Sequence, residues 1–297
     1  MRMTQTMLSN NMLTNLNKSY GLLGKYQEQL YTQQKISRPS DDPVIAVKGI
    51  QNRRSLEEVE QYNRNLGTVY EWLENSEDSL DKTGDVIHRI TDLVTRANNG
   101  SLTNEDREKI STELEEMKKH VLSIANTKVS GKYIFSGSDT KTETFSFDTA
   151  TSKYVYNGNT DNIDIEISEG MKISVNQIGD NLFGGLLNDI QDLQEAIKNP
   201  PAPGQDPDLS TFITKFQDNL DIVVSTRAKI GATTNRAELI ETRLSSQKII
   251  ATKRMSENED IDVEEVIMNL KTQESIHRAA LSVGASIIQP TLVDFMR

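Results

Sequence analysis

Two stretches of the sequence carry an apolar residue at every seventh position. The first series is Val59, Leu66, Leu73, Leu80, Ile87 and Val94. The second series is Leu209, Phe216, Val223, Ile230, Ala237, Leu244 and Ala251. A seven-residue repeat sustained over this length is typical of long helices that pack along one seam. Because the two series are similar in length and an insertion separates them, we expect two long helices that pair antiparallel within one chain.

Composition supports a fold with a narrow core. The chain has 297 residues, of which 35% are hydrophobic and 5% aromatic, which is lean for a compact globule of this size. A long bundle with much solvated surface accounts for these values. We therefore predict a mainly α fold, in which the N- and C-terminal regions form an elongated antiparallel long-helix bundle that carries a small β-rich inserted domain.

The insertion is marked by a change of pattern. Short β-type runs at 133–135, 144–147, 154–156, 163–167 and 172–175 alternate with glycine-containing turns. We accordingly divide the chain into three parts. These are a terminal helical assembly domain (1–43 plus 257–297), a long-helix bundle domain (44–131 plus 186–256) and a β-rich insertion domain (132–185).

The two ends of the chain are expected to be helices with little to bury. A helix over 4–34 has one apolar stripe, formed by Met12, Leu16, Leu23, Tyr26 and Leu30. A last helix over 263–288 is expected to bury Ile267, Leu270, Ile276, Ala280, Val283 and Ile287. Each helix has a single stripe and few charges, so we expect residues 1–36 and 261–297 to become ordered only when subunits pack together.

A loop at 35–43, Lys-Ile-Ser-Arg-Pro-Ser-Asp-Asp-Pro, separates the first two helices. Its two prolines prevent a helix from continuing through it. Ser40 and Asp41 are candidates to cap the next helix, Asp42 adds a favourable charge there, and Pro43 suits the first turn. A second cap is expected at Thr103, which forms a capping-box pattern with Asp106.

Several classes of function are disfavoured. The net charge of −11 argues against a nucleic-acid partner, although residues 1–40 are net basic. No cysteine is present, and no apolar run is long enough for membrane insertion. The three histidines, His88, His120 and His277, fall on three different predicted helices, so we expect no metal site. We also predict no catalytic site, no cofactor and no enzymatic activity.

Three segments resemble the bacterial flagellin superfamily. They are the start Met-Arg-Met, the loop at 35–43 and the tail from 261 to 297. Flagellin itself usually has Arg-Ala-Gly-Asp-Asp-Ala at the loop, where this chain has Arg-Pro-Ser-Asp-Asp-Pro. The segment 131–138, Gly-Lys-Tyr-Ile-Phe-Ser-Gly-Ser, is similar to the hook–filament junction branch of the superfamily.

This resemblance implies a structural component of the flagellum that adapts the hook to the filament. It implies synthesis in the cytoplasm, export through the flagellar type III apparatus and secretion to an extracellular appendage. The implied partners are another hook-associated protein, flagellin subunits, further copies of the chain in a ring and a cytoplasmic export chaperone. The alternatives are a flagellin-like filament subunit, a cytosolic coiled-coil scaffold and an enzyme housed in the β-rich insertion.

The candidate site is therefore an assembly interface. It combines apolar residues of the two terminal helices with charged residues of the loop, because the loop charges lie outside every apolar stripe. The predicted interface residues are Met12, Leu16, Leu23, Leu30, Arg38, Asp41, Asp42, Leu270, Ile276, Val283 and Ile287.

Overall fold

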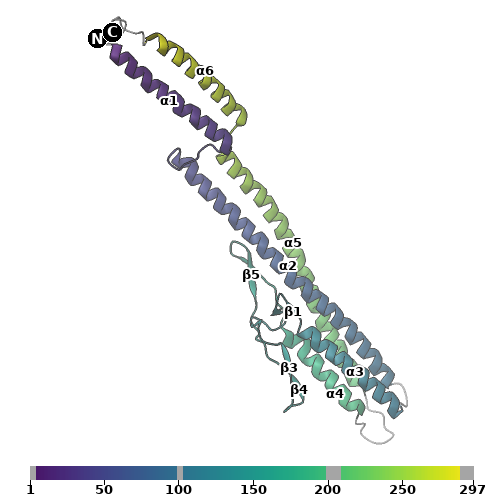
Figure 1. Ribbon diagram of the computed structural model, residues 1–297. Helices are drawn as coiled ribbons and strands as arrows, with labels where there is room; N and C mark the ends of the chain where they lie inside the picture. Colours follow the sequence, from purple (N-terminus) through teal and green to yellow (C-terminus); the bar gives the residue numbers. More distant parts are fainter. Residues whose placement is uncertain (1–4, 99–102, 199–208, 288–297) are drawn as a thin grey trace. The chain divides into compact units, whose positions relative to one another are not determined.

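The computed structural model describes residues 5–98, 103–198 and 209–287. The helices in these ranges are α1 (Gln5–Thr32), α2 (Pro43–Asn98), α3 (Asn104–Ala125), α4 (Gly185–Lys198), α5 (Ser210–Glu259) and α6 (Val263–Ile287), as Figure 1 shows. The strands are short and lie between α3 and α4 in the sequence. The prediction of a mainly helical protein with long helices and a small β-rich insertion is confirmed.

The chain forms two compact units. Residues 1–58 and 246–297 make one, called the terminal unit below, and residues 59–245 make the other, called the central unit. Both α2 and α5 contribute residues to each unit. The three-part division drawn from the sequence has its breaks at other positions and stays a prediction.

In the central unit, α2 and α5 run antiparallel. The Tyr70 hydroxyl donates a hydrogen bond to Glu241 Oε2 at 2.9 Å. Further along α2, Glu77 and Asp81 each lie 2.8 Å from the guanidinium of Arg227. Residue numbers that increase along α2 thus pair with residue numbers that decrease along α5, as in an antiparallel pair. Both seven-residue series are buried through this unit, which confirms the predicted pairing; the buried members are Leu66, Leu73, Leu80, Ile87, Val94, Leu209, Phe216, Val223, Ile230, Ala237 and Leu244.

Helices α3 and α4 complete the bundle of the central unit. The Thr103 hydroxyl accepts a hydrogen bond from the Asp106 amide and donates one to its carboxylate, so the predicted cap of α3 is confirmed. Arg89 of α2 pairs with Glu113 of α3. The Lys118 ammonium donates to the side-chain oxygens of Gln191 and Gln194 on α4, at 2.6 and 2.8 Å. These polar contacts fix the order in which the helices pack.

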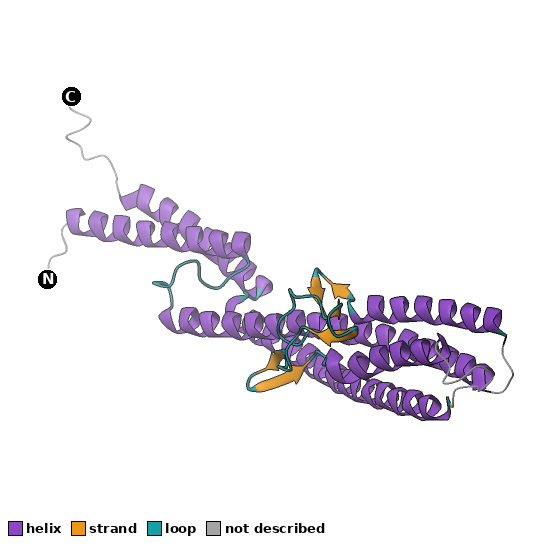
Figure 2. Cartoon of the chain, turned by 90° about the horizontal axis from the view of Figure 1, so that it is seen from below, coloured by secondary structure: helices purple, strands orange, loops and turns teal. Residues whose placement is uncertain are grey.

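The insertion consists of three separate antiparallel strand pairs, which Figure 2 shows among the helices of the central unit. They are β1 (Lys128–Val129) with β2 (Lys132–Tyr133), β3 (Phe145–Asp148) with β4 (Lys153–Tyr156), and β5 (Asp164–Ser168) with β6 (Met171–Ser174). A two-stranded pair is marginal alone. Here Phe135, Phe145 and Phe183 form a buried aromatic cluster at the π-helical turn Asp180–Gly184, which anchors the insertion to α4.

Candidate assembly site

In the terminal unit, α1 and α6 lie side by side and antiparallel (Figure 1). The Gln273 side chain donates a hydrogen bond to the Ser19 hydroxyl at 2.9 Å. The rings of Tyr20 and His277 lie 6.1 Å apart. A Cβ atom on Gly284 would collide with the end of the Met12 side chain, so Met12 packs directly against this glycine. The apolar stripe predicted on α1 therefore faces a helix of the same chain.

The predicted interface residues of the two helices fall into two groups. Four of them are half-buried along α1, and Leu270 is half-buried on α6; the four are Met12, Leu16, Leu23 and Leu30. By contrast, Ile276 and Val283 are 51% and 57% exposed. Ile287 ends α6, and its side chain lies outside the part of the structure that is described.

The expectation that α6 buries Ile267, Ile276 and Val283 is wrong. The stripe of α6 that is covered consists instead of Val266, Leu270, Gln273, His277, Ala280 and Gly284. These positions repeat at three- and four-residue intervals, as a covered helix face requires. Small and polar side chains occupy much of this face because α1 approaches closely there, and several larger apolar side chains are left outside it.

The terminal unit has almost no core of its own. Among its described residues, Val266 is the one hydrophobic side chain that is buried, at 8% exposed. Its surface carries large apolar side chains instead, led by Tyr31 at 91% exposed and Tyr20 at 71%. Exposed apolar surface on this scale marks a site of association. This unit therefore lacks the burial that keeps the central unit folded.

The loop between α1 and α2 is bound to the connection between α5 and α6. Helix α1 ends at Thr32, and Gln33 then adopts a left-handed conformation with φ of 58°, a common way to end a helix. The carbonyl of Gln33 accepts from the Ile261 amide at 3.2 Å, and the Lys35 amide donates to the Glu259 carbonyl at 2.7 Å. Two segments far apart in the sequence are thus joined by backbone hydrogen bonds.

The two adjacent aspartates of the loop have different roles. Asp42 Oδ1 accepts from the amides of Val44 and Ile45 at 2.9 and 3.1 Å, so Asp42 is the N-cap of α2. Asp41 Oδ2 instead accepts from the amides of Ser37 and Arg38 at 3.3 and 3.0 Å, which closes the loop on itself. The expectation that Ser40 or Asp41 caps α2 is wrong, whereas Pro43 does begin that helix.

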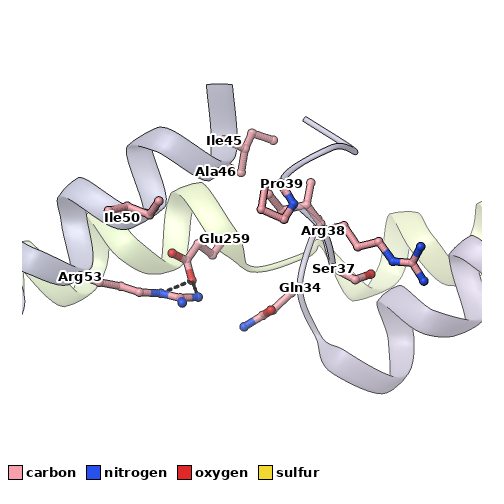
Figure 3. Close-up of a pocket in the computed structure, with 11 residues that line it drawn as sticks. Gln34, Ser37, Arg38, Pro39, Ile45, Ala46, Ile50, Arg53 and Glu259 are labelled. Carbon is pink, nitrogen blue, oxygen red and sulfur yellow. Dashed lines mark hydrogen bonds and ion pairs between the residues drawn. The ribbon is translucent and has the colours of Figure 1, made fainter. Parts of the chain in front are cut away.

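Beside this loop lies a hollow of about 200 Å³ with an ion pair at one end. The guanidinium Nη2 of Arg53 lies 2.6 Å from Glu259 Oε2, and this contact raises the pKa of Arg53, first by the hydrogen bond and then by the charge. Figure 3 shows Arg53 and Glu259 joined at one side of the hollow, with the guanidinium of Arg38 pointing away from them. Arg38 is exposed.

The ion pair was not predicted from the sequence. Glu259 is the last residue of α5. Arg53 lies more than two hundred positions away on α2, and no local pattern links the two. Within the described ranges, no group of His, Cys, Asp and Glu is suited to hold a metal ion, and none of the helices there is long and apolar enough to cross a membrane.

Comparison with known proteins agrees with this architecture. The family model of the bacterial flagellin N-terminal helical region matches residues 4–140. Flagellar hook-associated protein 3 of Escherichia coli (strain K12) is 25% identical over 93% of each chain, and its namesake in Salmonella typhimurium is 24% identical over 93% of each chain. A flagellar hook-associated protein from Vibrio parahaemolyticus superposes with a TM-score of 0.67 at 26% identity, covering 74% of this chain and all of that one.

The matched region makes residues 4–140 of this chain similar to the N-terminal helical region of the bacterial flagellins. Over nearly its whole length the chain is homologous to flagellar hook-associated protein 3.

Proposed function

We propose that this protein is a structural component of the junction between the flagellar hook and filament. The observation that carries the proposal is the terminal unit, which exposes large apolar side chains and buries only Val266 among its described hydrophobic residues. A chain that assembles in a tube wall needs such a surface, because burial between copies then replaces a core. The similarity to hook-associated protein 3 along 93% of the chain supports the same role.

The finer proposal names partners. Copies of the chain form a ring. One face of the ring contacts another hook-associated protein, and the opposite face contacts the first flagellin subunits. A cytoplasmic chaperone holds the chain before the flagellar type III apparatus exports it. The exposed side chains of Ile276 and Val283, together with the loop charge of Arg38, are the proposed contacts between copies. The protein would then act outside the cell as a non-enzymatic adaptor.

Deletion of the gene in its own bacterium tests the proposal. We expect cells that retain hooks but shed their flagellin into the medium, and we expect the full-length chain to restore attached filaments. Immunogold labelling of sheared appendages should place the protein in one narrow band at the hook end. Label along the whole filament would instead identify a filament subunit, and a stable dimer confined to the cytoplasm would identify a coiled-coil scaffold.

A further inference from the structure

We propose that the hollow beside the Arg53–Glu259 ion pair receives the phenol ring of Tyr31 from a second copy of this chain. The inference rests on the proposed function, because it assigns one contact between neighbouring copies in the assembly. Both partners of the contact belong to the terminal unit, where the apolar surface is exposed.

The hollow has the chemistry of a site for an aromatic side chain with a polar tip. Its apolar lining comes from Ile36, Pro39, Ala46 and Ile50, beside Ser37 and Arg38 of the loop. Its other end is polar, with the Gln34 amide and the Arg53–Glu259 pair (Figure 3). A volume of about 200 Å³ admits one side chain and excludes a helix. Tyrosine matches this arrangement because its ring is apolar and its hydroxyl needs a hydrogen-bond partner when buried.

The chain offers two exposed tyrosines on the described part of the terminal unit. Tyr20 already lies against the ring of His277 on α6. Tyr31 has a side chain that is 91% exposed, so it does not fill the hollow of its own chain. Its position, one residue before the end of α1, places it next to the loop that forms one wall of the hollow. Tyr31 is therefore the side chain available to a neighbour.

A contact of this kind defines the symmetry of the assembly. Tyr31 and the hollow are different surfaces of one chain, so a copy can give its tyrosine to one neighbour and receive one from another. Such head-to-tail contacts close into rings or continue as helices, whereas mutual exchange between two copies gives a two-fold dimer; the proposed ring requires the head-to-tail arrangement. The Arg53 side chain is 55% exposed, so its guanidinium is available to stack on the incoming ring.

The absence of cysteine allows a direct test. Cells lacking the native gene would co-express one full-length chain with Tyr31→Cys and another with Ile50→Cys, and their sheared appendages would be oxidised. We expect a cross-linked dimer that contains one copy of each variant. The matched control replaces Tyr31→Cys with Tyr20→Cys, and we expect that pair to give at least roughly tenfold less cross-linking, since Tyr20 has no hollow to enter.

The outcomes separate the two proposals. If both variants enter the appendages, filaments remain attached and no 31–50 cross-link forms, the inference is wrong while the junction role stands. If the unmodified full-length chain is missing from the appendages, the junction role itself is wrong. As a second measurement, Tyr31→Ala should weaken attachment of filaments roughly tenfold or more without changing the melting temperature of the monomer, and Tyr31→Phe should weaken it less. Attachment unaffected by Tyr31→Ala would also overturn the inference.

Discussion

Arg53, on the first turns of α2, forms an ion pair at 2.6 Å with Glu259, the last residue of α5. The Glu259 side chain is 11% exposed, whereas that of Arg53 is 55% exposed. The same residue, Glu259, binds the Lys35 amide through its backbone carbonyl. Glu259 therefore links the loop after α1 and the start of α2 to the end of α5. Because the terminal unit buries few side chains, we expect this contact to contribute much of its stability.

Gly49→Ala should disrupt this ion pair. A Cβ atom at position 49 would lie 2.6 Å from Glu259 Oε1, so the carboxylate that pairs with Arg53 must shift. The matched control is Gly67→Ala in the same helix, where nothing lies within 4 Å of the added atom. We expect Gly67→Ala to stabilise the chain by about 0.5–1 kcal/mol and Gly49→Ala to lose this gain. Chemical denaturation of both variants measures the difference, and equal stabilisation by both would contradict the expectation.

The antiparallel seam of the central unit is tested by a buried charge. Leu73 and Ile230 are 1% and 2% exposed, on α2 and α5 respectively. Leu73→Asp or Ile230→Asp places an unpaired carboxylate among apolar side chains and should lower the free energy of unfolding by about 3–5 kcal/mol. Leu239→Asp is the control, because this leucine of α5 is 74% exposed. If the circular-dichroism melts of all three variants match that of the parent, the residues of the seam are not part of the hydrophobic core.

The sequence predicted the central unit well because its signal is periodic. Both seven-residue series are continuous, and each indicates a long helix that must be covered along one face. The helix α6 was harder to predict, since Ile276 and Val283 are apolar yet exposed, whereas Gln273 and His277 lie on the covered face. In that helix close approach selects small and polar residues, so hydrophobicity alone points to the wrong face.

The loop shows a second limit of sequence reasoning. Ser40, Asp41 and Asp42 are all able to cap a helix, and their local sequence does not rank them. The choice of Asp42 follows from the loop, because Asp41 is already occupied by the amides of Ser37 and Arg38. Contacts between segments far apart in the sequence, such as that of Arg53 with Glu259, leave no periodic signal at all.

We expect the free energy of unfolding to fall at alkaline pH because of two tyrosines of the central unit, Tyr70 and Tyr156. Burial raises the pKa of Tyr70 to about 12, with a further contribution from its hydrogen bond to Glu241. Burial and then the charge of Asp180 raise the pKa of Tyr156 to about 12. The folded-state pKa values exceed the ordinary value of 10.0, so this contribution to stability is complete below pH 10 and is lost as the pH rises towards 12.

Urea melts across this pH range, with tyrosinate absorbance followed in parallel, measure the effect. The double variant Tyr70→Phe with Tyr156→Phe should show a shallower fall in stability above about pH 10 than the parent chain. Tyr31→Phe is the control, because Tyr31 is 91% exposed and lies outside the central unit. An unchanged pH profile in the double variant would assign the alkaline loss to other groups.

Arg38 separates assembly from folding. Its side chain is exposed and points away from Arg53 and Glu259 (Figure 3), while its backbone amide is what Asp41 binds. Arg38→Ala should therefore leave the melting temperature nearly unchanged and weaken filament attachment. Asp42→Ala serves as the comparison, since loss of the α2 cap should cost about 0.5–2 kcal/mol in stability. A large drop in monomer stability for Arg38→Ala, with normal attachment, would give the loop a purely structural role.

The last prediction concerns the order of α1 and α6 in the isolated chain. Ordering a residue costs about 1–2 kcal/mol in backbone entropy, and Val266 is the one buried hydrophobic side chain that the described part of the terminal unit sets against this cost. The buried hydrophobic residues of the central unit extend from Leu66 to Leu244, so its helices are held far more firmly. Limited proteolysis of a dilute monomer should cleave within α1 and α6 first and leave a resistant body, which the sequence alone places at about 44–255. In assembled appendages the same sites should be protected, because neighbouring copies then cover them. Equal protection of α1 and α6 in the dilute monomer, by proteolysis or by hydrogen exchange, would show that the chain needs no partner to order its ends and would favour a self-contained scaffold.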